Sequence, residues 1–161
     1  MSLDITFASI MSFFTITLLL VVYSILDLKD RRVRNEFIIA GGLVGGIVLI
    51  FTGHLTSNLV LHSTAFLLVV PIAYILFRIG SIGGADVKVL YVLAFISPGI
   101  ELGILSEPVL EAIIGLGGEL VVMLLGGYFY WRWRDGNENL APPLIPFLLT
   151  GYLTIQIFAL F

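Results

Sequence analysis

Long apolar runs joined by short connections are the feature that most limits what this chain can fold into. The first run extends from Ile5 to Leu26 without a charged residue. Of the 161 residues, 59% are hydrophobic and 12% are charged, whereas a soluble domain contains roughly 25% charged residues. One water-soluble core cannot bury so much apolar surface. The chain is therefore predicted to be an integral membrane protein.

Six stretches approach the length of about 20 apolar residues that a membrane-spanning helix needs. They are Ile5–Leu26, Phe37–Leu55, Leu59–Phe77, Val87–Leu105, Val109–Trp131 and Ala141–Phe161. The fourth stretch is the weakest because Pro98 and Glu101 interrupt it. The predicted fold is all-α: a polytopic membrane helix bundle of six transmembrane helices that forms one domain over residues 1–161.

The positions of the basic residues orient this bundle. All eight lie in or beside three connections, as Lys29, Arg31, Arg32 and Arg34, then Arg78 and Lys88, then Arg132 and Arg134. Six alternating segments put these connections on one side, which the positive-inside rule makes cytoplasmic. Both termini are then outside. The first segment has no basic residue before it and exceeds the roughly 7–15 residues of a signal-peptide core, so we expect it to be retained.

Two aspartates lie where apolar segments meet the predicted cytoplasmic face. Asp27 closes the first run, and Asp86 opens the fourth stretch directly after Gly83-Gly84-Ala85. Carboxylates at such positions are costly to bury and are functional candidates. If the two meet across the bundle, like-charge repulsion favours a pair that shares one proton, as in an aspartic protease. Asp27 and Asp86 are therefore the candidate catalytic residues.

Each of these residues also has a structural interpretation. Asp27 could be a solvated loop residue, and Asp86 could cap the fourth helix, where the helix dipole favours a negative charge. Lys88 could be an anchor that reaches the headgroups, and Asn35 could cap the second helix. A functional alternative is a small proton-coupled membrane transporter that uses Asp27 and Asp86, with Glu119, as a relay. A non-catalytic scaffold subunit is a further alternative.

Composition excludes several other kinds of site. There is no cysteine, so a disulfide framework, a thiolate zinc site and a cysteine nucleophile are impossible. His54 and His62 lie near a predicted outer loop, too far from the aspartates to indicate a metal centre, and Glu101 and Glu107 belong to the next outer loop. No metal or cofactor is expected. The net charge of −3 gives no reason to expect a nucleic acid partner.

Three segments resemble the motifs of prepilin and preflagellin peptidases. Residues 27–35, Asp-Leu-Lys-Asp-Arg-Arg-Val-Arg-Asn, resemble the first-aspartate loop of that family. Residues 83–88, Gly-Gly-Ala-Asp-Val-Lys, are similar to its second motif, Gly-x-Gly-Asp followed closely by Lys. Residues 143–148, Pro-Leu-Ile-Pro-Phe-Leu, resemble the start of its last helix. Ala85 replaces a family glycine, and Arg34 stands where proline is usual.

The resemblance implies a membrane-embedded aspartic endopeptidase of the plasma membrane with its active site facing the cytoplasm. Its substrates would be type IV pilin-like or archaellin precursors, from which it removes a short basic leader. The catalytic residues would be Asp27 and Asp86. The supporting or substrate-binding residues would be Gly83, Gly84, Ala85, Lys88, Arg31 and Asn35. Because the chain lacks the cysteine-rich segment of large bacterial members, the resemblance implies a minimal peptidase without N-methyltransferase activity.

Two further expectations concern how this site would meet a substrate. Gly83 and Gly84 are expected to adopt backbone conformations that a side chain would penalise, and to lie close to an extended peptide. Four acids could receive the basic leader, although each is also an ordinary solvated residue: Asp30, Glu36, Asp135 and Glu138. Intramembrane proteases of the presenilin kind share Gly-x-Gly-Asp, but they have more helices and a Tyr before the first aspartate, where this chain has Leu26.

Overall fold

The regular structure of the described chain is entirely helical. The structure is a computed structural model that describes residues 6–103, 105, 107–133 and 142–160. Within those ranges every regular element is an α-helix and no strand occurs. The predicted all-α fold is therefore confirmed.

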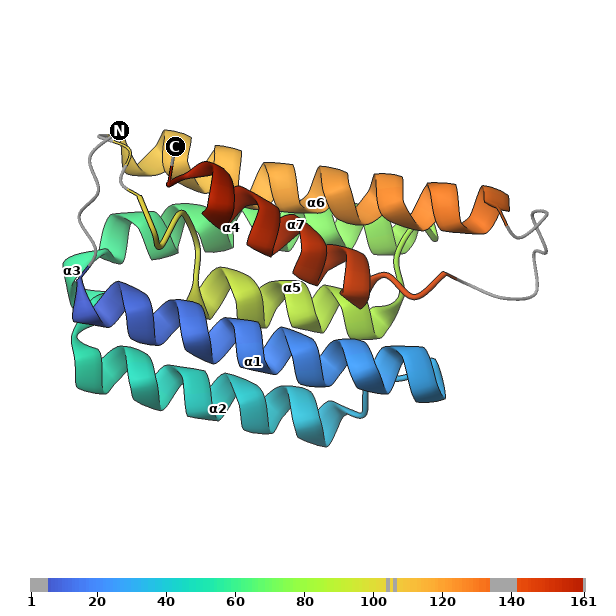
Figure 1. Cartoon of the computed structure of the whole chain (residues 1–161), viewed down its shortest axis with the longest axis horizontal. Helices are drawn as coiled ribbons and strands as arrows, with labels where there is room; N and C mark the ends of the chain where they lie inside the picture. Colours follow the sequence, from blue (N-terminus) through green and yellow to red (C-terminus); the bar gives the residue numbers. More distant parts are fainter. Residues whose placement is uncertain (1–5, 104, 106, 134–141, 161) are drawn as a thin grey trace.

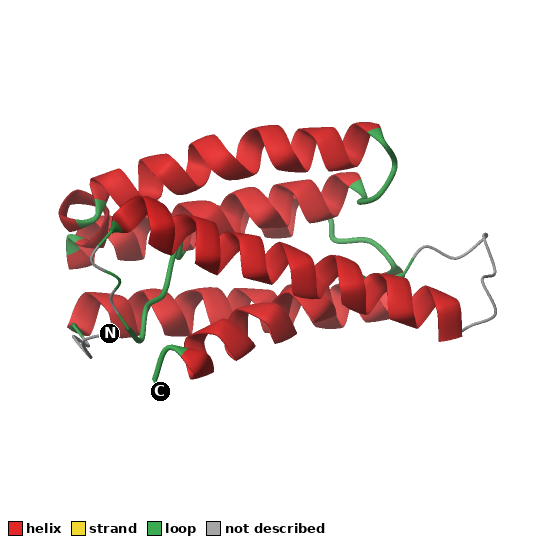
Figure 2. Cartoon of the chain, turned by 90° about the horizontal axis from the view of Figure 1, so that it is seen from above, coloured by secondary structure: helices red, strands yellow, loops and turns green. Residues whose placement is uncertain are grey.

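Seven helices are formed by the described residues. They are α1 (Phe7–Asp30), α2 (Asn35–Thr52), α3 (His54–Ser57), α4 (Leu59–Arg78), α5 (Gly84–Ile96), α6 (Pro108–Trp133) and α7 (Ile145–Phe158). Apart from the short α3, they lie side by side along one common direction (Figure 1). The view from above shows the same alignment (Figure 2). Consecutive long helices run in opposite directions, so the architecture is an up-and-down bundle.

Three helix boundaries differ from the predicted ones, for local reasons. The stretch predicted over 37–55 is interrupted at Gly53, whose φ of 69° ends α2 and separates it from α3. Helix α5 stops at Ile96, since Ser97 precedes Pro98 and takes up a non-helical φ of −137°. In the last stretch, α7 spans only Ile145–Phe158; residues 141 and 161 lie outside the described residues.

Among the described residues, four helices are long and apolar enough to cross a membrane: α1, α2, α4 and α6. Helices α5 and α7 have 13 and 14 residues, fewer than the about 20 that a full crossing needs. The outer surface carries large exposed apolar side chains, such as Phe51 at 86% and Leu67 at 75% exposure. Such a surface suits lipid contact. The chain is a multi-pass membrane protein, and the six-span count remains a prediction.

Close helix packing fixes the centre of the bundle. Helix α1 packs against α2 and α7, α2 packs against α5, and α6 packs against both α4 and α7. Glycines permit the approach of α2, because a Cβ at Gly41 would overlap the Tyr23 hydroxyl and one at Gly45 would overlap Ile96. Small residues at such contacts let helix backbones come close together. The long helices are therefore held in fixed register around the shared core.

The two ends of the bundle differ in charge. One end gathers the C-terminal ends of α1, α4 and α6 and the N-terminal ends of α2, α5 and α7 (Figure 1). The described basic residues lie there: Lys29, Arg31, Arg32, Arg34, Arg78, Lys88 and Arg132. We call this the basic end, and the other the opposite end. Arg134 lies outside the described residues, as do both chain termini, whose predicted location is untested.

Candidate active site

Asp27 lies in the last turn of α1, at the basic end. Its side chain is only 8% exposed. One carboxylate oxygen, Oδ2, accepts a hydrogen bond of 3.4 Å from the backbone N–H of Ile145, the first residue of α7. The first N–H groups of a helix have no partner within it, so they are available to an anion. Asp27 is thus a buried residue held by the start of α7, and the interpretation as a solvated loop residue is wrong.

Arg31 ends α1 just beyond Asp27. Its φ of 53° is left-handed, and its backbone N–H donates to the carbonyl of Asp27 at 3.1 Å. A residue with left-handed backbone geometry at the end of a helix is usually glycine or asparagine. The Arg31 side chain reaches across to α6, where Nη2 donates to the Tyr130 hydroxyl at 3.5 Å. Arg31 therefore both shapes the turn after Asp27 and links α1 to α6.

Asp86 is the third residue of α5 and lies at the same end of the bundle. It is 9% exposed, and its Oδ2 accepts a 2.8 Å hydrogen bond from the backbone N–H of Gly83. This is the reciprocal half of a capping box, in which an acidic side chain reaches back to the residue that precedes the helix. Asp86 therefore does cap α5, as one alternative predicted.

The glycines before Asp86 do not adopt the backbone conformation that was expected. Gly83 has φ −82° and ψ 163°, which any residue can adopt, and Gly84 already belongs to α5. Among the described glycines, positive φ occurs at Gly53 and Gly80. What restricts position 83 is space, since a Cβ there would lie 3.0 Å from Oδ2 of Asp86. A Cβ at Gly84 would meet Phe77 at an ordinary 3.7 Å.

The two aspartates interact with each other. Helices α1 and α5 are in contact, so they bring two buried carboxylates to the same end of the bundle, where the charge of Asp27 is a smaller influence on Asp86 than burial is. Two partly desolvated carboxylates of like charge resist ionising together and titrate as a pair. The arrangement can therefore hold one carboxylate and one carboxylic acid at the same end of the bundle, which is the requirement for acid–base cleavage of a peptide bond.

Lys88 and Asn35 form a contact between α5 and α2 beside this pair. Lys88 Nζ donates to Asn35 Oδ1 at 2.6 Å. Asn35 is the first residue of α2 and its preceding cap residue is Arg34, which makes no side-chain capping bond. The prediction that Asn35 caps the helix is therefore wrong, and its side chain instead joins the starts of two helices. Ala85, the residue before Asp86, is half-buried.

Sequence reasoning did not identify Ile145 and Ser24 as neighbours of the site. Ile145 contributes its main-chain N–H, and the resemblance of residues 143–148 to a family motif was the signal that marked this position. Ser24 is buried one turn before Asp27, and its hydroxyl has no hydrogen-bond partner among the described residues. A hydroxyl three residues from a catalytic candidate lies on the same helix face.

The other acidic residues divide between the surface and the interior. Asp30 and Glu36 are exposed at the basic end, and Glu36 pairs with Arg34 at 2.9 Å. Asp135 and Glu138 lie outside the described residues. Glu119 is 1% exposed in the middle of α6, and its Oε2 has no hydrogen-bond partner in the described structure. Among the described residues, no group of three or more His, Cys, Asp or Glu side chains is arranged to hold a metal ion.

Fold and site together define a polytopic helical membrane protein with paired buried aspartates at one end of its bundle. The model of the type IV leader peptidase family matches residues 13–160. The chain therefore belongs to the type IV leader peptidase family, which confirms the resemblance inferred from its motifs. It is a membrane protease of the leader peptidase kind, and the substrates of this family are pilin-like precursors. No curated protein and no solved structure matches the chain.

Proposed function

We propose that this chain is an aspartic endopeptidase whose catalytic residues are Asp27 and Asp86. The observation that carries the proposal is the meeting of two buried carboxylates, one from α1 and one from α5, close enough for their charges to interact. Each is held in place by a main-chain N–H group. An acid and a base that share one proton are the minimum that peptide hydrolysis by this mechanism needs.

In the proposed reaction, water attacks the carbonyl carbon of the scissile peptide bond. The ionised aspartate takes one proton from that water as the new C–O bond forms, and the protonated aspartate donates its proton to the carbonyl oxygen. When the tetrahedral intermediate collapses, the C–N bond breaks, the departing nitrogen receives a proton from the pair, and a hydroxyl group of the intermediate returns a proton to the pair. The products are a carboxylic acid and an amine, and the two aspartates again hold one proton between them.

The proposed substrate is a type IV pilin-like or archaellin precursor, cleaved at the cytoplasmic face of the plasma membrane. The location of the pair supports this choice, since both aspartates lie at the basic end, which the positive-inside rule assigns to the cytoplasm. In such a precursor the apolar helix lies in the membrane and the leader lies in the cytoplasm. The bond between leader and helix would therefore lie at the same depth as the two aspartates. We further propose that residues 1–161 form one six-helix peptidase domain without N-methyltransferase activity.

The supporting residues have distinct roles in this proposal. Gly83 leaves room for the carboxylate of Asp86. Lys88 and Asn35 hold the starts of α5 and α2 together beside it, and Arg31 shapes the turn that follows Asp27. Gly84 and Ala85 begin the helix that carries Asp86. None of these side chains needs to take part in the transfer of protons.

The proposal predicts that Asp27→Asn and Asp86→Asn each lower precursor cleavage by at least about a thousand-fold, because each change removes the site of the shared proton. The pair acts as one unit, so the double variant should be scarcely slower than either single variant. The measurement is the initial rate of cleavage of a tagged pilin-like precursor by purified protein in liposomes, with sequencing of the new N-terminus.

Glu119→Gln is the matched control, since it removes a different buried carboxylate from the same bundle in the same way. A peptidase that uses Asp27 and Asp86 should retain most of its activity in this variant. Substantial cleavage by either Asn variant would identify a structural aspartate. If Glu119→Gln also lost activity, a relay that includes Glu119 would become the better explanation.

A further inference from the structure

A buried polar network surrounds the C-terminal end of α5, at the opposite end of the bundle from Asp27 and Asp86. The helix stops at Ile96, and residues 97–103 of the connection to α6 are not helical. Their backbone N–H and C=O groups therefore have no partners within a helix, and buried groups of this kind need partners elsewhere. Side chains of neighbouring helices supply several of them.

Gln156 of α7 holds this connection at two points. Its side chain is 0% exposed. The amide Nε2 donates to the carbonyl of Gly99 at 3.1 Å, and Oε1 accepts from the backbone N–H of Glu101 at 2.8 Å. The donor and the acceptor of one amide are thus both used by the connection, so the end of α7 fixes its position.

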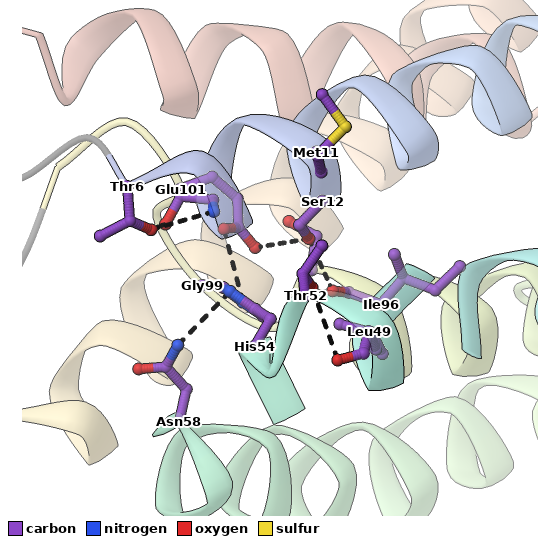
Figure 3. Close-up of polar contacts among 12 residues, drawn as sticks. Thr6, Met11, Ser12, Leu49, Thr52, His54, Asn58, Ile96, Gly99 and Glu101 are labelled. Atoms are coloured by element: carbon purple, nitrogen blue, oxygen red, sulfur yellow. Dashed lines mark hydrogen bonds and ion pairs between the residues drawn. The ribbon is translucent and has the colours of Figure 1, made fainter. Parts of the chain in front are cut away.

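Ser12 of α1 and Tyr152 of α7 hold the end of α5 itself. The Ser12 hydroxyl contacts two acceptors, the carbonyl of Ile96 at 2.8 Å and Oε1 of Glu101 at 3.0 Å (Figure 3). The Tyr152 hydroxyl pairs with the hydroxyl of Ser97, the residue after α5, at 3.1 Å. All of these residues are buried. The far end of α5 is therefore joined by hydrogen bonds to both α1 and α7.

The cluster around Glu101 is completed by His54 of α3. The second carboxylate oxygen of Glu101, Oε2, lies 3.5 Å from His54 Nε2, and Figure 3 shows the two side chains facing each other beside Ser12. With a partner at each oxygen, this carboxylate holds the cluster together and is not a binding site for a further group.

The same three helices build the candidate active site at their other ends. Asp27 lies in the last turn of α1, Asp86 lies in the first turn of α5, and α7 begins with the N–H group of Ile145 that holds Asp27. Helix α5 has 13 residues, which is a length of about 20 Å. A movement of its far end along the helix axis is therefore transmitted to Asp86.

Apolar packing alone controls this movement weakly. Helix α5 packs mainly against α2 and α4, and its contact with α1 is smaller. Apolar side chains tolerate a small slide past one another, whereas hydrogen bonds require distances close to 3 Å. The polar contacts at the far end are thus the most direct constraint on the depth of α5 relative to α1 and α7.

We propose that Ser12, Tyr152 and Gln156 are positioning residues that set the depth of Asp86 relative to Asp27. They fix the far end of α5 to α1 and α7, and the rigid helix carries this register to the pair of aspartates. The inference rests on the proposed function, since it gives the three residues a role in the reaction of that pair. They lie at the opposite end of the bundle and act only through α5.

Gln156→Met should lower kcat for precursor cleavage at least about tenfold and leave KM within about twofold of the parent. Methionine fills a similar space without the amide donor, so α5 can shift, and a displacement of about 1 Å can lower the rate a hundredfold. The pH range of cleavage should also narrow, because carboxylates that lie farther apart repel each other less and share one proton over a smaller range. The measurement uses the full-length protein in liposomes, with rates normalised to folded protein.

Glu111→Gln is the matched control. Glu111 of α6 holds the same connection, since its two oxygens accept from the backbone N–H groups of Ile100 and Leu105 at 3.1 and 3.3 Å, but it does not join α5 to α1 or α7. An amide has one acceptor oxygen, so this variant should lower the unfolding temperature and keep kcat within about twofold. If Gln156→Met does not fold, Tyr152→Phe, which removes one hydroxyl, should lower kcat at least about threefold and narrow the pH range.

The contrary results are distinct from a failure of the proposed function. Parent values of kcat and of the pH range in Gln156→Met and Tyr152→Phe would overturn the positioning role. An equal loss in Glu111→Gln would also overturn it, since the order of the connection would then matter and not its link to α1 and α7. Retained cleavage by Asp27→Asn or Asp86→Asn would instead overturn the proposed function, and this inference with it.

Discussion

At the scale of single residues, main-chain donors hold both candidate catalytic carboxylates. Ile145 donates its backbone N–H to Asp27 and Gly83 donates its backbone N–H to Asp86. A backbone donor at a helix start moves only when the helix itself moves, so it fixes a carboxylate more firmly than a long side chain does. The geometry of the pair therefore depends on where α5 and α7 begin.

Gly83→Ala and Gly84→Ala should differ sharply, although the two glycines are adjacent. A Cβ at position 83 would lie 3.0 Å from Oδ2 of Asp86 and push that carboxylate out of place, whereas one at position 84 makes an ordinary contact of 3.7 Å with Phe77. We expect cleavage by Gly83→Ala to fall at least about tenfold and Gly84→Ala to stay within about twofold of the parent. A displacement of about 1 Å at an active site can lower the rate a hundredfold.

Initial cleavage rates, normalised to the amount of folded protein, provide the comparison. Equal rates for the two variants would mean that the space beside Asp86 is not what requires glycine at position 83.

At the scale of helices, the contact between Lys88 and Asn35 links the starts of α5 and α2. Because the contact is exposed, its contribution to the free energy of unfolding should be below about 1 kcal/mol. Lys88→Met and Asn35→Ala should therefore leave stability nearly unchanged. Each should lower cleavage about tenfold, through movement of the α5 start that carries Asp86.

A double-mutant cycle on cleavage rates tests this linkage. Two residues that act through one contact should give a double variant no slower than either single variant. If the two effects multiplied, Lys88 and Asn35 would have separate roles, for example in contacting the substrate.

Helix α2 offers a second test at this scale, on packing. In Gly45→Ala the new methyl group would overlap Ile96, which is fully buried, whereas in Gly42→Ala it would meet Val92 at an ordinary 3.6 Å. Overpacking of a core costs roughly 1–3 kcal/mol, while Gly to Ala in a helix gains up to about 1 kcal/mol of intrinsic propensity. Gly45→Ala should therefore lower the unfolding temperature and Gly42→Ala should maintain or raise it.

Thermal unfolding of both variants in the same detergent checks this expectation. Because the substitution is identical and both sites lie on one helix, a lower unfolding temperature for Gly42→Ala than for Gly45→Ala would contradict the packing of α2 against α5.

At the scale of the whole molecule, the separation of charge predicts how the bundle lies in the membrane. Asp30 is at the basic end and Asn58 is at the opposite end, so the positive-inside rule puts residue 30 in the cytoplasm and residue 58 outside. The chain has no cysteine, which permits single-site labelling. In intact cells, an impermeant thiol reagent should label Asn58→Cys and should label Asp30→Cys only after the membrane is opened.

Labelling of Asp30→Cys from outside intact cells would reverse the orientation, and would move the proposed active site to the outer face.

The sequence by itself determined the helical fold, the two aspartates and the end at which they lie. Apolar runs and clusters of basic residues are local patterns, and local patterns remain readable without tertiary contacts. The breaks at Gly53 and before Pro98 are also local, but an apolar run can conceal them. Sequence motifs marked residues 143–148 as important without revealing how they act.

The tertiary structure alone decided what each of these residues contacts. Ile145 meets Asp27 across 118 positions of sequence, and Lys88 meets Asn35 across 53. Such pairs depend on which helix faces pack together and on the register of that packing. The pattern of charges along the sequence determines neither of these. The expected glycine conformations failed for the same reason: position 83 is restricted by the carboxylate of Asp86 beside it and not by its own φ. The cluster around Glu101 joins α1, α3, α5–α6 and α7, so only the packed bundle brings it together.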